Sequence, residues 1–206
     1  MGVDVGSTEL ALGFRMVAAL IALTTLPVRA AVVIESVTLD GQPAHHSIRA
    51  SLSRDGQIVV FQSKSPQLVP EDTNGDIEGP RSIYGSDVFV RDRMTCVTER
   101  VSVGAGGQQG NSDSYAPAMS AGGRFVTFTS WADNLVDRDT NHLRDIFIHD
   151  RVTLTTERVS IGAGGVEGWG QSRGWAPVSA DGRVVVFSSE ATNIVPNPPP
   201  YDQNGE

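Results

Sequence analysis

The chain has 206 residues, which is enough for one domain with its own hydrophobic core or for one and a half. Its 16 basic and 24 acidic side chains leave a formal net charge of −8. Because phosphate binding needs clustered Lys and Arg, and Lys64 is the only lysine, these counts argue against a nucleic-acid partner. The single cysteine, Cys96, excludes a disulfide within the chain.

Residues 1–31 have the features of a signal peptide. Arg15 precedes an apolar run over 16–26, and a proline and small residues follow it. The run has 11 residues, whereas a membrane-spanning helix needs about 20, so no stable membrane span is expected. The acidic residues before Arg15 are untypical of a signal, which leaves two alternatives: translation from Met16, or a buried apolar segment. Export predicts an extracytoplasmic location, periplasmic or secreted.

A repeat organises the rest of the chain. Its opening phrase combines a serine, an Asp-Gly or Gly-Gly pair and a run ending in phenylalanine, and it occurs three times. In the first two copies an Asp-Thr-Asn turn follows, then an Asp-apolar-Phe-apolar segment, then Thr-Glu-Arg-Val-Ser. An internal repeat of this length is typical of propellers and other arrays. The phrases occupy 53–61, 120–128 and 179–187, the turns 72–74 and 139–141, and the later segments 87–92, 145–150, 98–102 and 156–160.

Each repeat predicts four short strands and no helix. The Asp-Gly or Gly-Gly pairs that begin at 55, 122 and 181 predict two-residue hairpins between the first and second strands. The second and third strands are apolar on both faces, so both faces must be covered. The fourth strand, at 99–103 and 157–161, alternates polar and apolar residues and is therefore expected at the outer edge.

Tandem four-stranded sheets with buried inner strands are typical of β-propeller blades. The phrase from Ser179 to Ser189, with the later Asp-(Ile/Val)-Phe-(Ile/Val)-x-Asp segment, resembles the WD40-like (PD40) repeats of TolB-type propellers. The predicted fold class is all-β: a partial β-propeller built from tandem four-stranded antiparallel blades, about two full blades plus an incomplete third. The predicted propeller spans 32–206, with an outer strand at 33–39, blades at 45–103 and 112–161, and a partial blade at 173–206.

The resemblance implies an extracytoplasmic, non-catalytic protein that binds proteins or small ligands at propeller loops. Since known propellers close with at least about four blades, the sequence predicts a fragment, with uncovered blade faces through which it could self-associate. In this interpretation the Asp202-Gln-Asn-Gly segment is the third copy of the Asp-Thr-Asn turn. The alternative is the propeller portion of a larger hydrolase or peptidase whose catalytic part is missing from this chain.

The first Asp-Thr-Asn turn is a candidate calcium site. Asp72, Asn74 and Asp76 alternate in a glycine-containing loop, and Asp87 begins the next strand. Ca²⁺ binds six to eight oxygens with flexible geometry, which this spacing offers. The alternative is a plain turn, because Asp and Asn side chains close Asx-turns without a metal. No other cofactor is predicted.

Partner contacts are predicted at loops that carry aromatic or arginine side chains. Arg81 and Tyr84 lie in an insertion of the first copy, and Trp169 lies in the connection after the second. A second tryptophan, Trp175, aligns with Tyr115 and is expected in the core.

No catalytic residue is assigned. Ser172 stands in a Gly-x-Ser-x-Gly pattern, which in hydrolases forms a nucleophile elbow between a strand and a helix. The flanking residues predict neither element, so we expect a loop between blades. The sequence therefore favours a binding scaffold over an enzyme.

Overall fold

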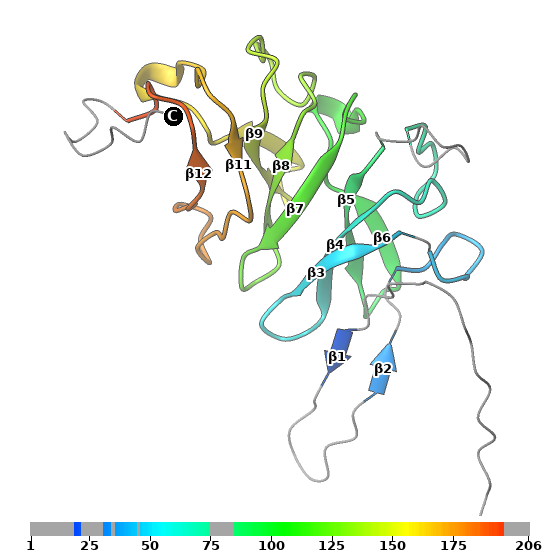
Figure 1. The fold of residues 1–206 in the computed structure, drawn as a ribbon. Helices are drawn as coiled ribbons and strands as arrows, with labels where there is room; N and C mark the ends of the chain where they lie inside the picture. Colours follow the sequence, from blue (N-terminus) through cyan, green and yellow to red (C-terminus); the bar gives the residue numbers. More distant parts are fainter. Residues whose placement is uncertain (1–18, 22–30, 34–35, 45, 75–84, 196–206) are drawn as a thin grey trace, which may run out of the picture.

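The computed structural model describes residues 19–21, 31–33, 36–44, 46–74 and 85–195. Two four-stranded antiparallel sheets lie side by side, and a two-stranded sheet follows the second (Figure 1). In both larger sheets the strands are ordered in space as in the sequence. The first blade contains β3 (Ile48–Leu52), β4 (Ile58–Ser63), β5 (Asp87–Asp92) and β6 (Val97–Arg100); the second contains β7 (Ser114–Met119), β8 (Phe125–Ser130), β9 (Asp145–Asp150) and β10 (Thr155–Arg158); the third unit contains β11 (Ser172–Arg173) and β12 (Ser188–Ser189).

The predicted fold class is confirmed: the structure is all-β and built from tandem antiparallel blades. The described residues contain no α-helix, only two three-residue 3-10 turns, η1 (Ala105–Gly107) and η2 (Ala163–Gly165). The alternating strands β6 and β10 lie at sheet edges, as their sequences predict. Within the described ranges, no helix has the length and apolar character needed to cross a bilayer.

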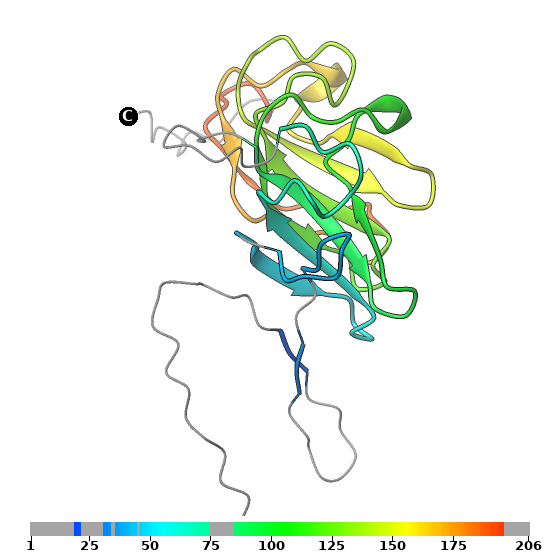
Figure 2. The ribbon, with the colours of Figure 1, turned by 90° about the vertical axis from the view of Figure 1, so that its right-hand side faces the viewer.

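The N-terminal region contributes one small ladder. Strand β1 (Ala19–Ile21) pairs antiparallel with β2 (Ala31–Val33), and the pair lies apart from the blades in both views (Figures 1 and 2). The rest of the predicted signal segment lies outside the described residues. Of the predicted outer strand at 33–39, residues 34–35 also lie outside, and Val37 forms an isolated bridge with Pro43. The end of the predicted partial blade, 196–206, is likewise outside the described part.

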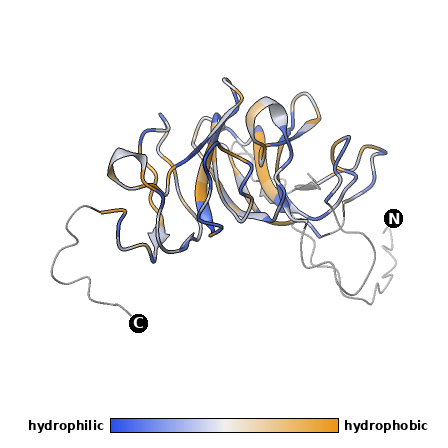
Figure 3. Ribbon diagram, turned by 90° about the horizontal axis from the view of Figure 1, so that it is seen from above, coloured by the Kyte–Doolittle hydropathy of each residue, from blue (hydrophilic) through white to orange (hydrophobic). Residues whose placement is uncertain are grey.

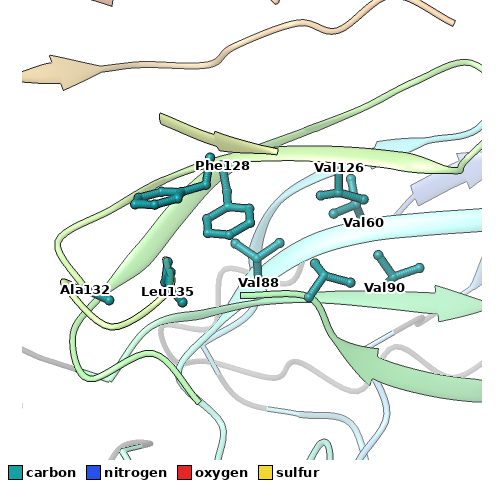
Figure 4. Packing of buried hydrophobic residues seen from close by; sticks show 9 residues of the cluster. Val60, Val88, Val90, Val126, Phe128, Ala132 and Leu135 are labelled. Carbon is teal, nitrogen blue, oxygen red and sulfur yellow. The ribbon is translucent and has the colours of Figure 1, made fainter. Parts of the chain in front are cut away.

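The larger of two core clusters lies between the two blades, and the smaller one, around Phe61 and Phe89, belongs to the first blade. Strands β4 and β5 are buried along most of their length, as are β8 and β9, which confirms the prediction from their apolar runs. Apolar segments therefore face one another between the sheets (Figure 3). Figure 4 shows Val60, Val88 and Val90 of the first blade packed against Val126 and Phe128 of the second. Each such buried side chain contributes about 1.5–3 kcal/mol.

The connections between first and second strands differ from the predicted two-residue hairpins. Ser53 N donates to Ile58 O, so the connection has four residues, and only Gly56 has a positive φ, of 71°. The reason is the serine: its Oγ accepts a hydrogen bond from Ile58 N and donates to Asp55 Oδ1. These side-chain bonds stabilise a longer turn. The same serine–backbone bond recurs at Ser120 and Ser179.

Candidate functional site

The first strand of each blade carries a β-bulge. The pairing register shifts between Ile48 and Ser51 in β3, and between Tyr115 and Ala118 in β7. At these shifts Arg49 has a φ of 56° and Ala116 a φ of 53°. Such left-handed backbone is uncommon for residues other than glycine and costs on the order of 1–2 kcal/mol. Bulges redirect side chains and are enriched beside functional sites.

The two bulges and the corresponding segment of the third unit meet at one place. Together they line a hollow of about 380 Å³. We call it the bulge hollow, because its lining comes from the bulge segments of β3 and β7 and from the corresponding segment of the third unit. Its lining residues are Arg49, Ala50, Ser51, Ala116, Pro117 and Trp175.

Trp175 is 64% exposed, so its predicted place in the core is wrong. The third copy has one residue more between Ser172 and Ser179 than the second has between Ser114 and Ser120. The extra residue lies in the bulge segment, so Trp175 corresponds to a bulge residue rather than to Tyr115. Its indole therefore lines the hollow instead of packing between blades.

The bulge hollow combines a cation with apolar surface. Arg49 is exposed, and none of the described residues forms an ion pair with it. Ala116 and Pro117 supply apolar walls beside the Trp175 indole. An arginine beside an exposed indole can bind a ligand that carries both an anionic group and a flat apolar group.

The predicted calcium ligands come together in a second place, the first cluster (Asp72, Asn74, Asp87, Arg100 and Gln109). Gln109 Nε2 donates to Asp72 Oδ1 at 2.9 Å, to Asn74 Oδ1 at 2.5 Å and to Asp87 Oδ2 at 3.2 Å. Arg100 Nη1 lies 3.3 Å from Asp72 Oδ1 and 3.7 Å from Asp87 Oδ2. These oxygens therefore already surround an amide and a guanidinium of the chain itself.

The second blade repeats this arrangement in the second cluster (Asp139, Asn141, Asp145, Arg158 and Glu167). Arg158 Nη1 lies 2.9 Å from Asp139 Oδ1, 3.3 Å from Asp145 Oδ2 and 2.9 Å from Glu167 Oε1. The Glu167 carboxylate also accepts hydrogen bonds from the backbone N and the hydroxyl of Thr140, at 2.7 and 2.6 Å. One buried guanidinium thus neutralises part of the charge of three carboxylates.

A serine fixes the carboxylate at the start of each third strand. Ser102 Oγ donates to Asp87 Oδ1 at 2.6 Å and accepts from Val88 N at 3.1 Å. Ser160 Oγ donates in the same way to Asp145. Both serines are fully buried. These buried bonds join the third strand to the fourth and help to set the register between them.

Burial governs the ionisation of these carboxyls. It raises the pKa of Asp87 to about 6, although hydrogen bonding from Ser102 and the Arg100 charge oppose the rise. It also raises the pKa of Asp139 to about 6, against the Arg158 charge. At Glu167 burial acts in the same direction, but hydrogen bonds from Thr140 and Arg158 outweigh it and lower the pKa to about 2.

Three of the four predicted calcium ligands lie within the described residues, and the fourth, Asp76, lies outside them. Among the described residues no group of three or more His, Cys, Asp or Glu side chains is arranged to hold a metal ion. Ca²⁺ at Asp72 and Asp87 would share their oxygens with the Arg100 guanidinium, and the two cations would repel. The calcium site stays a prediction.

Of the three predicted partner-binding residues, one lies within the described residues and two lie outside them. Arg81 and Tyr84 lie outside the described residues. Trp169 is 77% exposed on the connection after the second blade, where its backbone N donates to Asn193 Oδ1 at 2.9 Å. It does not line the bulge hollow.

Ser172 is not presented to solvent. It is fully buried in β11, and its Oγ donates to Ser189 Oγ at 2.9 Å. The predicted loop at this serine is therefore a short strand pair with β12. The corresponding serines of the second blade, Ser114 and Ser130, are bonded in the same way at 2.9 Å, so the pair is a repeated structural feature.

Sequence reasoning missed both the bulges and the arginines. The arginine signal is present in the repeat, since Arg100 and Arg158 each stand two residues before the buried serine in Thr-Glu-Arg-Val-Ser. The bulges have no such signal, because arginine and alanine replace the glycine that a positive φ favours.

No protein-family model and no curated protein matches the chain. Among solved structures, it is similar to TolB from Acinetobacter baumannii, with 19% sequence identity and a TM-score of 0.38. It is also similar to the β-propeller domain of the Trilobed protease from Pyrococcus furiosus, with 10% identity and a TM-score of 0.42.

The similarity covers 67% and 69% of this chain but only 25% and 34% of the two matched chains, so this chain spans a quarter to a third of their lengths. These are the kinds of structure that the repeat predicts. At such low identities and TM-scores, the fold rests on the sheets themselves. Their order and pairing make the described residues two β-propeller blades and part of a third.

Proposed function

We propose that this chain is a non-catalytic, exported β-propeller module and that it binds its ligand in the bulge hollow. The observation that carries the proposal is that the bulges of β3 and β7 and the corresponding segment of the third unit meet around one hollow of about 380 Å³. A repeated backbone distortion that lines a concavity costs free energy, and function is a common reason for keeping it.

The lining residues favour a peptide with an acidic side chain beside an aromatic one. Arg49 offers a fork of N–H donors to a carboxylate. Trp175 and Pro117 offer flat apolar surface to an aromatic ring. A volume of about 380 Å³ holds a few side chains, which is typical of a small binding pocket.

A tryptophan-fluorescence titration tests this proposal. The variant Trp131→Phe/Trp169→Phe leaves Trp175 as the sole tryptophan reporter. The probe is the acetylated peptide Gly-Asp-Phe-Gly, and its matched control is Gly-Lys-Phe-Gly. We expect a saturable change in Trp175 emission with the acidic peptide alone, and its loss in Arg49→Glu but not in Arg54→Glu, since Arg54 does not line the hollow. Equal responses to both peptides would refute the proposal.

Export is proposed from the apolar run over 16–26, and secretion of a tagged full-length chain tests it. We expect the chain in the periplasm of a bacterial host, shortened at its N-terminus near Ala30. Leu20→Asp, which interrupts the apolar run, should retain the unprocessed chain in the cytoplasm. Cytoplasmic accumulation of the unaltered chain would contradict export and leave the ligand proposal untouched.

The non-catalytic part of the proposal is supported by Ser172, the one serine in a hydrolase-like pattern, because its hydroxyl is buried and bonded to Ser189. A fluorophosphonate probe tests it directly. We expect no covalent labelling of Ser172 in the folded chain, and labelling there would contradict the proposal.

A further inference from the structure

The bulge of β7 lies where the ladder with β8 loses its register. Ala116 and Pro117 stand at this shift, so two residues of β7 oppose one of β8. Pro117 has no N–H to donate to the ladder. The left-handed φ of Ala116, 53°, is a further cost in free energy. Contacts from outside the sheet are therefore needed to hold this bulge in one conformation.

Gln62 of the first blade supplies such a contact. It pairs with Val88 of β5, whose side chain belongs to the core cluster between the first two blades. Paired residues point to the same face of a sheet, so the Gln62 side chain points toward the second blade. Its Oε1 accepts a hydrogen bond from Ala116 N at 3.3 Å. Ala116 is 3% exposed, so the loss of this acceptor would be costly.

Thr129 of the second blade does the same for the third unit. It follows Phe128 as Gln62 follows Phe61, so the two positions are equivalent in the repeat. The fully buried Thr129 donates through Oγ1 to Gly174 O at 3.0 Å. Because the Gly174 carbonyl and the nitrogen of Trp175 share one planar peptide unit, this bond fixes the backbone that carries the indole.

A second hydroxyl of β8 holds the other side of Trp175. Thr127 Oγ1 donates to Ala176 O, and Thr127 stands two residues before Thr129, on the same face of the strand. The indole that lines the bulge hollow is thus carried by a segment with one threonine bond on each side.

The bulge residues are the variable part of the repeat, whereas the frame around them is constant. In each unit the bulge comes two residues after a serine, and that serine is hydrogen-bonded to a second serine. The bulge position and its successor differ in every copy: Arg49-Ala50, Ala116-Pro117 and Gly174-Trp175. Variable side chains on a constant, rigid frame are typical of residues that determine ligand specificity.

We infer that Gln62 and Thr129 are positioning residues of the bulge hollow, an inference that rests on the proposed function of the hollow. Each holds the bulge of the following unit and so orients the side chains that face the ligand. Neither residue lines the hollow, so each acts through the bulge that it holds. A surface held in place before binding loses less conformational freedom when the ligand arrives, which favours affinity.

An isosteric pair of variants tests Thr129. Thr129→Val keeps the shape and removes the hydroxyl, whereas Thr129→Ser keeps the hydroxyl. Both are made in the Trp131→Phe/Trp169→Phe background, where Trp175 is the sole tryptophan. Without ligand, the fluorescence anisotropy of Trp175 should fall in Thr129→Val, because the indole gains nanosecond mobility, and should be retained in Thr129→Ser.

The same variants are then titrated with the acetylated peptide Gly-Asp-Phe-Gly. We expect the affinity to fall about tenfold in Thr129→Val and to change less than about twofold in Thr129→Ser. Thr156→Val is the matched control, since Thr156 Oγ1 also donates to a carbonyl of another blade, that of Val103, but does not line or flank the hollow. It should leave the peptide affinity and the Trp175 anisotropy unchanged.

Amide hydrogen exchange tests Gln62. Gln62→Met removes the acceptor and should make the Ala116 amide exchange about tenfold faster, whereas Gln62→Glu keeps an acceptor and should exchange like the unaltered chain. This pair also carries the test if Thr129→Val does not fold.

Equal peptide affinities of Thr129→Val and the unaltered chain overturn the inference. An unchanged Trp175 anisotropy or an unchanged Ala116 exchange rate does so as well. If the unaltered chain does not bind the peptide, the proposed function fails, and the anisotropy and exchange rates still decide whether Gln62 and Thr129 hold the bulges.

Discussion

The first and second clusters differ in one side chain and therefore in charge. Each has a buried arginine, an aspartate from the Asp-Thr-Asn turn and an aspartate at the start of the third strand. In the first cluster Gln109 donates its amide hydrogens to the acidic oxygens. In the second, Glu167 occupies the equivalent position and adds a third carboxylate.

Gln109 and Glu167, here called the connecting residues, differ in charge, yet the two clusters have the same geometry. The geometry of the cluster therefore does not depend on the charge of its connecting residue. The glutamine satisfies the oxygens as a donor, whereas the glutamate satisfies the guanidinium as an acceptor. The second cluster is the more charged of the two, so its stability should depend more strongly on its arginine and on pH.

Replacing the arginine of a cluster should have the largest effect on the free energy of unfolding. Arg158→Met leaves the buried Asp139 and Asp145 carboxylates and the partly exposed Glu167 carboxylate without their cation, and it should lower the free energy of unfolding by about 3–5 kcal/mol at pH 7. Arg100→Met should cost less, because two carboxylates are affected and Gln109 still donates to both. Urea unfolding at pH 7 measures both losses, with Arg183→Met as the exposed control. If Arg158→Met does not fold at pH 7, partial refolding at pH 5 is expected, because Asp139 is then protonated.

The second largest effect is the dependence of the free energy of unfolding on pH. Asp87 has a pKa of about 6 in the folded chain against a usual value of 3.8, so the folded state binds a proton more tightly than the unfolded state between these values. The pKa of Asp139 is likewise raised to about 6 in the folded chain. Stability should therefore rise, by on the order of 2 kcal/mol for each group, as pH falls from about 7 to 4. Below that, stability should decline as Asp150 and Glu167, whose pKa values are lowered, become protonated.

Thermal unfolding across pH 3–8 measures this dependence. Asp87→Asn removes one titrating group and keeps an oxygen for Ser102, so its curve should be flatter between pH 4 and 6. A curve for Asp87→Asn that parallels that of the unaltered chain would contradict the assignment to Asp87.

The buried serines should give a smaller and equal effect in both clusters. Ser102→Ala and Ser160→Ala each remove a hydrogen bond to a buried carboxylate and should cost about 1.5–3 kcal/mol. Because the two serines make the same contacts, the two losses should agree within about 0.5 kcal/mol. Ser188→Ala, at an exposed serine, is the control. Unequal losses would show that the connecting residue changes the bonding of the serine.

Exchange of the connecting residue should change the free energy of unfolding little, but it should change the pKa of the neighbouring aspartate. Glu167→Gln gives the second cluster the composition of the first and should alter the free energy of unfolding by less than about 1 kcal/mol. The Glu167 charge contributes to the raised pKa of Asp139, so the variant should lower that pKa. Carboxyl titration by nuclear magnetic resonance checks this shift, and the reverse exchange, Gln109→Glu, should raise the pKa of Asp87.

The smallest expected effect is that of calcium. Since Arg100 and Gln109 already bind the oxygens of Asp72 and Asp87, about 1 mM Ca²⁺ should leave the Tm unchanged. A rise in Tm that Asp72→Asn or Asp76→Asn abolishes would instead establish the predicted calcium site.

The sequence predicted the strands of the blades because the repeat occurs three times and its apolar runs suit a strand covered on both faces. It predicted that Asp72, Asn74 and Asp87 lie together, since an Asx-turn and a strand start recur in register. It could not identify Arg100 as the cation between them, because the arginine comes from a neighbouring strand and its pairing depends on the sheet. The bulge at Arg49 was also beyond prediction, since long-range pairing overrides the local preference against a positive φ.

Gln109 and Glu167 each belong to two blades at once. The Gln109 side chain binds the carboxylates of the first blade, while its carbonyl oxygen accepts a hydrogen bond from Asn134 Nδ2 of the second at 2.9 Å. Glu167 is bonded likewise to the second blade and, through its carbonyl, to Asn193 Nδ2 at 2.7 Å. Opening of one unit therefore loosens its neighbour, and amide hydrogen exchange should report the two blades as one cooperative unit rather than as independent modules.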